Sequence, residues 1–98
     1  MFRLRWSERA ARDFEDILDY IGSENPYNAR LVRDRILKSI ANLEMFSLGQ
    51  EGPRGTFKLY MPRTSYFVIF RRDEKGDVGI RAVVHASRDW EEFDWSDV

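Results

Sequence analysis

The chain opens with a strict alternation of apolar and basic positions over FRLRW, residues 2–6. Phe2, Leu4 and Trp6 fall on one face of an extended chain, and Arg3 and Arg5 fall on the other. A period of two indicates a short β-strand with one buried face. The sequence therefore predicts an N-terminal strand whose second face is cationic.

The period then changes to that of a helix. Ser7 offers a capping hydroxyl, and apolar positions recur at helical spacing until Gly22. Asn25 and Pro26 suit the cap and first turn of a second helix, whose apolar stripe extends to about residue 46. Because the connection is short, the two helices are expected to form an antiparallel hairpin.

Three strand patterns follow the Gly- and Pro-rich loop LGQEGPRGT. TFKLYM alternates, YFVIFR is apolar on both faces, and VGIRAVVHA is rich in Val and Ile. Turn residues separate the three runs, which indicates an antiparallel meander with YFVIFR at its centre. The order β-α-α-β-β-β predicts an α+β fold, a two-layer sandwich with an N-terminal helical hairpin packed on an antiparallel sheet.

Composition limits the size and class of the protein. Its 98 residues, 43% of them hydrophobic, suit one domain spanning residues 1–98. There is no cysteine, which excludes disulfides, thiolate metal sites and a Cys nucleophile. No metal site or cofactor is expected. No segment resembles a signal peptide or a membrane span, so no membrane association and a cytoplasmic location are expected.

Charge is distributed unevenly although the net charge is only -1. Residues 47–88 hold eight basic and four acidic side chains, whereas residues 89–98 hold five acids and no base. The basic half could face an anionic partner, and the acidic tail, about residues 91–98, could screen it. A solvated surface is the simpler interpretation of the same pattern.

Strand parity predicts which side chains face away from the helices. If Phe57, Ile80 and Val84 meet the helices, the opposite face is cationic, with one aromatic and one imidazole: Arg3, Arg5, Lys58, Tyr60, Arg71, Arg81 and His85. Such a face could cleave RNA without a metal, bind an anionic partner, or simply be solvated. We predict that His85, the single histidine, closes the last strand without a catalytic role.

Four stretches resemble a known family. WSERAARDFEDILDYIGSENPYNA is similar to the first helix and Asn-Pro junction of the ParE branch of the RelE/ParE toxins, the toxin half of type II toxin–antitoxin modules. GPRGTFKL, YFVIFRRD and VVHASRDW resemble this family's second-strand turn, central strand and closing strand, in that order. The resemblance covers about residues 4–90.

The resemblance implies a bacterial toxin, associated with plasmid stabilisation, that inhibits DNA gyrase by binding and is neutralised by a ParD-like antitoxin. On that basis no catalytic residue, no cofactor and no sequence-specific DNA binding by the chain alone are expected. The antitoxin is expected on Arg30, Arg33, Lys38, Arg54 and Arg71. The target is expected on Arg81, His85, Trp90, Phe93 and Trp95, with the acidic tail partly docked through its aromatic residues.

Two alternatives stay open. A RelE-like relative would be a ribosome-dependent, metal-independent mRNA endonuclease, with Lys58, Arg81, His85 and Arg88 as its catalytic candidates. RelE-like enzymes carry a late Tyr or His, and this chain has no tyrosine after Tyr66, which favours the ParE interpretation. The third possibility is a toxin fold that has lost toxicity and only binds its partner.

Overall fold

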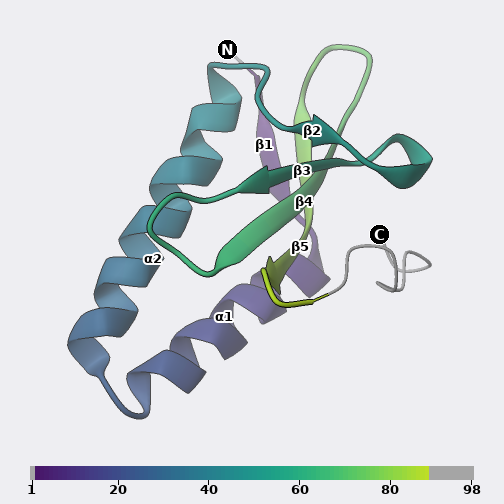
Figure 1. Cartoon of the computed structure of the whole chain (residues 1–98). Coiled ribbons are helices and arrows are strands. Elements are labelled where there is room, and N and C mark those ends of the chain that lie inside the picture. The colour runs from purple at the N-terminus through teal and green to yellow at the C-terminus, as the bar shows by residue number, and fades with distance from the viewer. Residues whose placement is uncertain (1, 89–98) are drawn as a thin grey trace.

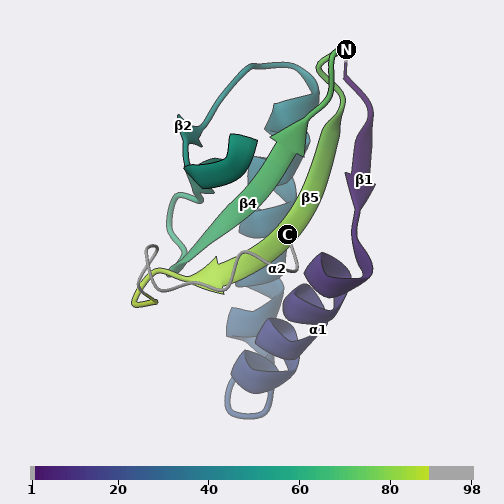
Figure 2. The ribbon, with the colours of Figure 1, turned by 90° about the vertical axis from the view of Figure 1, so that its right-hand side faces the viewer.

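The computed structural model of this chain describes residues 2–88. Two helices, α1 (Glu8–Gly22) and α2 (Pro26–Ala41), form a hairpin beside a five-stranded sheet of order β1-β5-β4-β3-β2 (Figure 1). The strands are β1 (Leu4–Trp6), β2 (Gln50–Glu51), β3 (Phe57–Tyr60), β4 (Tyr66–Arg72) and β5 (Val78–His85). In the side view, α2 lies behind β4 and β5 on one face of the sheet (Figure 2). The predicted two-layer α+β sandwich is confirmed.

Both helix starts follow from the local sequence. The Ser7 hydroxyl accepts the Ala10 N–H at 3.0 Å, and the Asn25 side chain accepts the Asn28 N–H at 3.0 Å. The end of α2 was predicted too late, because the helix stops at Ala41 and the chain continues in a 3-10 turn over Asn42–Glu44. Tightening of the last turn is a common way to satisfy terminal carbonyl groups.

The sheet is mixed rather than wholly antiparallel. Strands β3, β4 and β5 form the predicted antiparallel meander, but β1 pairs in parallel with β5. The short β2 lies in the loop LGQEGPRGT, where no strand was predicted, and pairs with the start of β3. Alternation along one strand does not encode the direction of its neighbour, so the sequence pattern could not distinguish these pairings.

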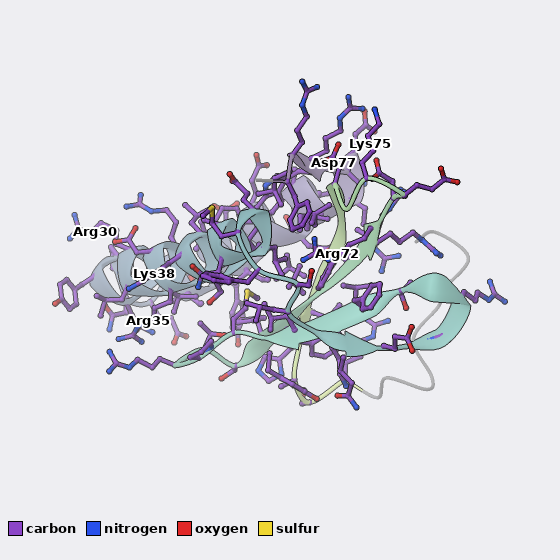
Figure 3. All side chains as sticks on the ribbon, turned by 90° about the horizontal axis from the view of Figure 1, so that it is seen from above. Arg30, Arg35, Lys38, Arg72, Lys75 and Asp77 are labelled. Carbon is purple, nitrogen blue, oxygen red and sulfur yellow. The ribbon has the colours of Figure 1, made fainter. Side chains whose placement is uncertain are left out.

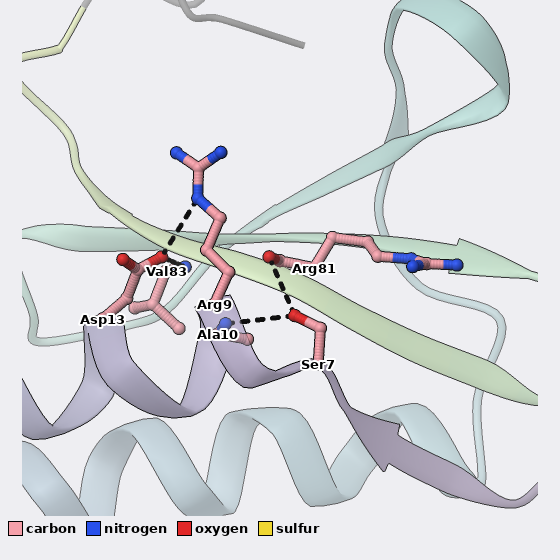
Figure 4. Close-up of polar contacts among 6 residues, drawn as sticks. All are labelled: Ser7, Arg9, Ala10, Asp13, Arg81 and Val83. Carbon is pink, nitrogen blue, oxygen red and sulfur yellow. Dashed lines mark hydrogen bonds and ion pairs between the residues drawn. The ribbon is translucent and has the colours of Figure 1, made fainter. Parts of the chain in front are cut away.

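Beyond the end of β1, helix α1 packs along the edge of β5 (Figure 4). The Ser7 hydroxyl donates to the Arg81 carbonyl at 3.2 Å, and the Asp13 carboxylate accepts the Val83 N–H at 3.1 Å. Burial raises the pKa of Asp13, and the opposing effects of the Val83 hydrogen bond and Arg9 are smaller. The N-cap of α1 and a side chain of its first turns thus supply hydrogen bonds that a longer β1 would have made.

The middle of the sheet is buried on both faces. The helix-facing core includes Ile36, Ile40, Leu43, Val68, Phe70, Ile80 and Val83. A second buried cluster lies on the opposite face and consists of Phe67, Ile69, Ala82 and Val84. The prediction that YFVIFR is a central strand with two apolar faces is confirmed, because β4 supplies residues to both clusters.

Candidate functional site

Basic side chains surround a cavity of about 500 Å³ at the end of the sheet where β1, β5 and β4 meet. We call it the cationic hollow. Its lining consists of Arg3, Arg5, Arg71, Arg72, Asp73, Lys75, Asp77, Val78, Gly79 and Arg81. Basic residues outnumber acidic ones in this lining, although the whole chain carries a net charge of -1. Basic residues from β1, β4 and β5 are therefore brought together around this hollow.

Strand pairing explains how the hollow forms. Arg5 is opposite Gly79 on β5, and Gly79 is opposite Arg71 on β4, so the three residues form one row across the sheet. Residues in such a row point to the same face. Gly79 has no side chain, and the Arg81 guanidinium lies over it, with Nε 3.7 Å from the position that a Cβ would take.

The two acids of the lining are bound to backbone groups. Asp73 accepts the N–H groups of Lys75 and Asp77 at 2.8 and 3.0 Å, which closes the β4–β5 turn. Asp77 accepts the N–H of Arg3 at 2.9 Å and so joins the turn to β1. Both carboxylates therefore have a structural role in holding the two strands.

Arg72 lies at the margin of the hollow but its guanidinium is directed elsewhere (Figure 3). It donates to the carbonyl groups of Gly76 and Phe46 at 2.9 and 2.8 Å, and its carbon Cζ lies 5.1 Å from the Phe2 ring centroid. Burial lowers the pKa of Arg72. This arginine fastens the turn to the loop after α2, so the charge facing the hollow comes from the other basic residues.

Arg81 lines the hollow and is also the extra residue of a β-bulge. Ile69 pairs with Ala82 but the next residue, Phe70, pairs with Ile80, which leaves Arg81 as the extra residue of β5. Its side chain points away from α1 (Figure 4), and its Nε is buried without a hydrogen-bond partner among residues 2–88. A buried guanidinium N–H without an acceptor is costly, so this atom is suited to an anion.

The same bulge corrects the predicted position of His85. Beyond it, Val83 joins the helix-facing core, and Ala82 and Val84 face away, opposite to the predicted parity. His85 then lies on the helix side, edge-on to Tyr66 at a centroid distance of 5.2 Å. Its Nδ1 accepts the Ser87 N–H at 3.0 Å. His85 is therefore not part of the cationic face.

Gly79 was the sequence signal for the bulge. An isolated glycine inside a strand pattern often marks a bulge or a close approach. Gly79 lies two positions before the extra residue, Arg81. Ile80 and Arg81 were placed on the correct faces, but strict parity was continued past Arg81, so the side chains after it on β5 were placed on the wrong face.

Lys58 and Tyr60 occupy the same face as the hollow, on β3. The Lys58 ammonium donates to the Tyr60 hydroxyl at 3.3 Å and lies 5.2 Å from the Phe67 ring centroid. Lys58 on β3 is paired with Ile69 on β4, and Ile69 is paired with Ala82, the residue after Arg81 on β5. The side chains of Ile69 and Ala82 therefore lie between the Lys58–Tyr60 pair and Arg81. The predicted RNase set is thus divided, because His85 is on the opposite face while Lys58 and Arg81 share one.

A second depression of about 450 Å³ lies between α2 and β3. We call it the hairpin groove. Its lining consists of Arg35, Lys38, Ser39, Asn42, Leu48, Leu59, Tyr60, Pro62 and Arg63. Strand β2 pairs only with Phe57 and Lys58, so it leaves the edge of β3 beside this groove uncovered. The groove therefore combines cations, apolar side chains and a strand edge.

The five predicted antitoxin contacts do not form one surface. Lys38 lines the hairpin groove, while Arg30 is exposed nearer the start of α2 and Arg33 pairs with Asp34 at 3.2 Å (Figure 3). Arg71 donates to the Arg54 carbonyl at the other end of the sheet.

The sequence interpretation missed Arg35 and Arg63, which lie beside Lys38 in the groove. Arg35 could have been found from its i,i+3 spacing to Lys38. Arg63 is placed by a turn and left no such signal.

Of the predicted target contacts, Trp90, Phe93 and Trp95 lie outside the described residues, as does the acidic tail. Arg88, the last described residue, is exposed, and its N–H donates to the His85 carbonyl at 3.0 Å. None of the helices within residues 2–88 is long and apolar enough to cross a membrane.

Comparison with solved structures shows the same fold in toxin–antitoxin proteins. The chromosomal ParDE system from P. aeruginosa matches with a TM-score of 0.78 and 22% identity, over 87% of this chain and 96% of the other. The RelBE2 complex from Mycobacterium tuberculosis matches with a TM-score of 0.57 and 22% identity, over 86% and 90%. The isolated E. coli RelE toxin matches with a TM-score of 0.61 and 19% identity, over 91% and 88%.

Comparison by sequence gives the family. No curated protein matches the chain. The profile of the ParE toxin of the type II toxin–antitoxin system parDE matches residues 4–90, which is most of its length. The chain therefore belongs to the family of ParE toxins of type II toxin–antitoxin systems.

Proposed function

We propose that this toxin acts in the cytoplasm by binding and inhibiting DNA gyrase, and that a ParD-like antitoxin neutralises it. The observation that carries this proposal is the division between the two faces of the sheet. The face with the cationic hollow holds several arginines, and the bulge turns His85 to the other side. A cationic face without an imidazole suits docking to an acidic or nucleic-acid surface better than proton transfer.

The similarity to the P. aeruginosa ParDE system supports an antitoxin partner. The hairpin groove is the best candidate for its seat, because an extended segment could pair with the uncovered edge of β3. Apolar side chains of the antitoxin segment would contact Leu48 and Leu59. Acidic side chains of the segment would contact Arg35, Lys38 and Arg63. Plasmid stabilisation is the biological role such a pair would serve.

A ribosome-dependent mRNA endonuclease is the second candidate function. It is favoured by the Lys58–Tyr60 hydrogen bond, which places an ammonium 3.3 Å from an ionisable hydroxyl on the cationic face. In that mechanism Arg81 and Arg88 would stabilise a pentavalent phosphate and Tyr60 would transfer the proton. His85 would not contribute, because it lies on the helix side of the sheet, with residues such as Ile21 and Val32, and not on the cationic face.

Two assays on one protein preparation separate these functions. Purified toxin would be added to gyrase with relaxed plasmid, and to translating ribosomes with a labelled mRNA. Gyrase inhibition predicts lost supercoiling and intact mRNA, and the variant Arg5→Gln/Arg81→Gln should lose most of the effect. The exposed helix variant Arg30→Gln is the matched control. Cut mRNA with normal supercoiling, abolished by Tyr60→Phe, would replace the proposal with the nuclease.

The antitoxin site has an independent test. The variant Arg35→Glu/Arg63→Glu reverses two charges of the hairpin groove, and we expect it to weaken antitoxin binding at least tenfold. Toxicity in the absence of antitoxin should be retained. Unchanged antitoxin affinity would move the binding site away from this groove. A protein that binds antitoxin but affects neither gyrase nor mRNA would support the third interpretation, a toxin fold without toxicity.

A further inference from the structure

The cationic hollow has a strong local charge of one sign. Six basic and two acidic residues line it, so its formal charge is +4 in a chain whose net charge is -1. Both acids accept backbone N–H groups, and Arg71 and Arg72 each donate to a carbonyl group. Within residues 2–88, four side chains of the lining have no ion-pair or hydrogen-bond partner, and these are Arg3, Arg5, Lys75 and Arg81.

Arg81 is the fixed member of this set. Its backbone carbonyl accepts the Ser7 hydroxyl at 3.2 Å, and its neighbours on β5, Ile80 and Ala82, are fully buried. Its guanidinium lies across Gly79, with Nε, Nη2 and Cζ at 3.7, 3.9 and 4.0 Å from the position that a Cβ would take. A guanidinium that is already ordered loses little conformational entropy when an anion binds to it, so Arg81 is a suitable centre for a binding site.

Exposed cations from β1 and from the β4–β5 turn flank this guanidinium. Arg5 is opposite Gly79 in the pairing of β1 with β5, at the separation of neighbouring strands, about 4.8 Å. Arg3 lies two residues earlier on the same face of β1, about 7 Å further along the strand. Lys75 comes from the turn that Asp77 joins to β1 (Figure 3). The positive charges are therefore repeated at short intervals around a concave floor.

This arrangement favours a phosphodiester backbone as the ligand. A nucleic-acid backbone carries negative charges at regular intervals, and guanidinium groups bind phosphate oxygens in a bidentate manner. No aromatic side chain of residues 2–88 lines the hollow, so the described part of the chain offers no platform there for unstacked bases. Duplex DNA keeps its bases stacked and presents its phosphates outward, so it fits this lining better than a single strand does.

We propose that the cationic hollow binds the phosphodiester backbone of duplex DNA without reading its sequence. Arg81 holds a phosphate at the centre of the hollow, and Arg3 and Arg5 hold phosphates beside it. Lys75 adds a further charge from the turn. This inference deepens the proposed gyrase inhibition and rests on it for its biological role, because gyrase holds duplex DNA while it changes supercoiling. In that role the toxin contacts the DNA as well as the enzyme.

The salt dependence of binding reports how many phosphates the hollow neutralises. Each one contributes about -0.9 to the slope of the logarithm of the binding constant against the logarithm of the salt concentration, so three contacts predict a slope of about -3. Removing two of the three should leave a slope of about -1. Sequence-independent binding has a Kd on the order of 10⁻⁴ to 10⁻⁶ M at physiological salt, so the measurement begins at low salt, where binding is tighter.

The test uses the full-length toxin and a fluorescent DNA duplex of about 12 base pairs, slightly more than one helical turn. Fluorescence anisotropy would give the Kd at several salt concentrations, and NMR would follow the Gly79 amide and the Arg81 Nε–Hε signal during the titration. The hollow variant is Arg5→Gln/Arg81→Gln. The matched control, Arg12→Gln/Arg30→Gln, removes the same charge from exposed positions of the helical hairpin. Circular dichroism would verify that both variants are folded.

We expect the duplex to shift both NMR signals of the wild type. The hollow variant should bind the duplex at least tenfold more weakly at low salt, with the salt slope reduced in magnitude by about two, and the control should stay within about twofold of the wild type. Equal losses in the two variants, or a titration that leaves both signals unchanged, would overturn the proposal. Tighter binding of poly-glutamate than of the duplex, with the same signals shifted, would assign the hollow to an acidic protein instead.

A supercoiling assay on the same preparations separates this inference from the proposed function. Gyrase inhibition by a toxin that does not bind the duplex would refute the inference and leave the proposed function in place. Binding of the duplex at the hollow by a toxin that leaves gyrase active would refute the proposed function and leave the DNA site in place.

Discussion

The carboxylate of Asp13 is predicted to be a main attachment of α1 to the edge of β5. It accepts the Val83 N–H at 3.1 Å, at a point on β5 beyond the residues that β1 pairs with. Removing the acceptor with Asp13→Ala would leave the amide of a buried residue without its partner. That loss costs about 1–3 kcal/mol, and about 2 kcal/mol would lower the Tm of a domain this size by roughly 10 °C.

The variant Asp13→Asn separates the hydrogen bond from the charge. An amide oxygen can still accept the Val83 N–H, and the Arg9–Asp13 contact that it loses is long, at 3.9 Å, and partly exposed to solvent. We therefore expect Asp13→Asn to be close to wild type at pH 7, within about 0.5 kcal/mol, and clearly more stable than Asp13→Ala.

The pH dependence has a definite sign. Burial raises the pKa of Asp13 in the folded protein above its ordinary value of 3.8, so folding favours the protonated form. The stabilisation from this proton is complete below pH 3.8 and is lost as pH rises through the raised pKa. Asp13→Asn has no such proton, so its stability relative to wild type should increase across that window.

The measurement is urea denaturation of the wild type, Asp13→Asn and Asp13→Ala at several pH values between 3 and 7, with hydrogen exchange of the Val83 amide. Exchange should accelerate in Asp13→Ala and remain slow in Asp13→Asn. The reasoning is refuted if the two variants are equally stable at neutral pH, or if the Val83 amide is equally protected in both.

Three further predictions concern other contacts. Ser7→Ala removes both the cap on Ala10 and the bond to β5, and should cost about 1–2 kcal/mol in urea denaturation, where Ser7→Thr should cost less. Gly76→Ala places a Cβ 2.5 Å from the Phe2 ring at a φ of +89°, so Tm should fall by several degrees; an unchanged Tm would contradict the geometry. Burial raises the pKa of Tyr66 above its ordinary value of 10.0, so this side chain should ionise at a higher pH than an exposed tyrosine, and the protein should lose stability as it does. Ultraviolet absorbance of the wild type, with Tyr66→Phe as the reference, would follow the ionisation.

The sequence alone determined the type and order of most elements. Ser7, Asn25 and Pro26 fix where the helices begin, because caps act through bonds two or three residues away. The apolar runs fix β3, β4 and β5, because burial on one or both faces must appear as a period. The position of Arg3, Arg5 and Arg71 on the face opposite the helices could also be predicted. It required only the alternation of side chains along strand segments that the bulge does not affect.

Tertiary structure decided what local pattern cannot encode. The parallel pairing of β1 with β5 depends on where the helical hairpin returns the chain, and the end of α2 depends on the packing of the turn that follows. The bulge at Arg81 depends on the fit between β4 and β5, and one extra residue there moves His85 to the helix side while leaving Arg81 in the hollow. Side-chain parity is cumulative along a strand, so one irregular pair reverses every later position. The sequence therefore predicted which residue types form the cationic hollow. The fold decided which of the predicted side chains lie on each face of the sheet.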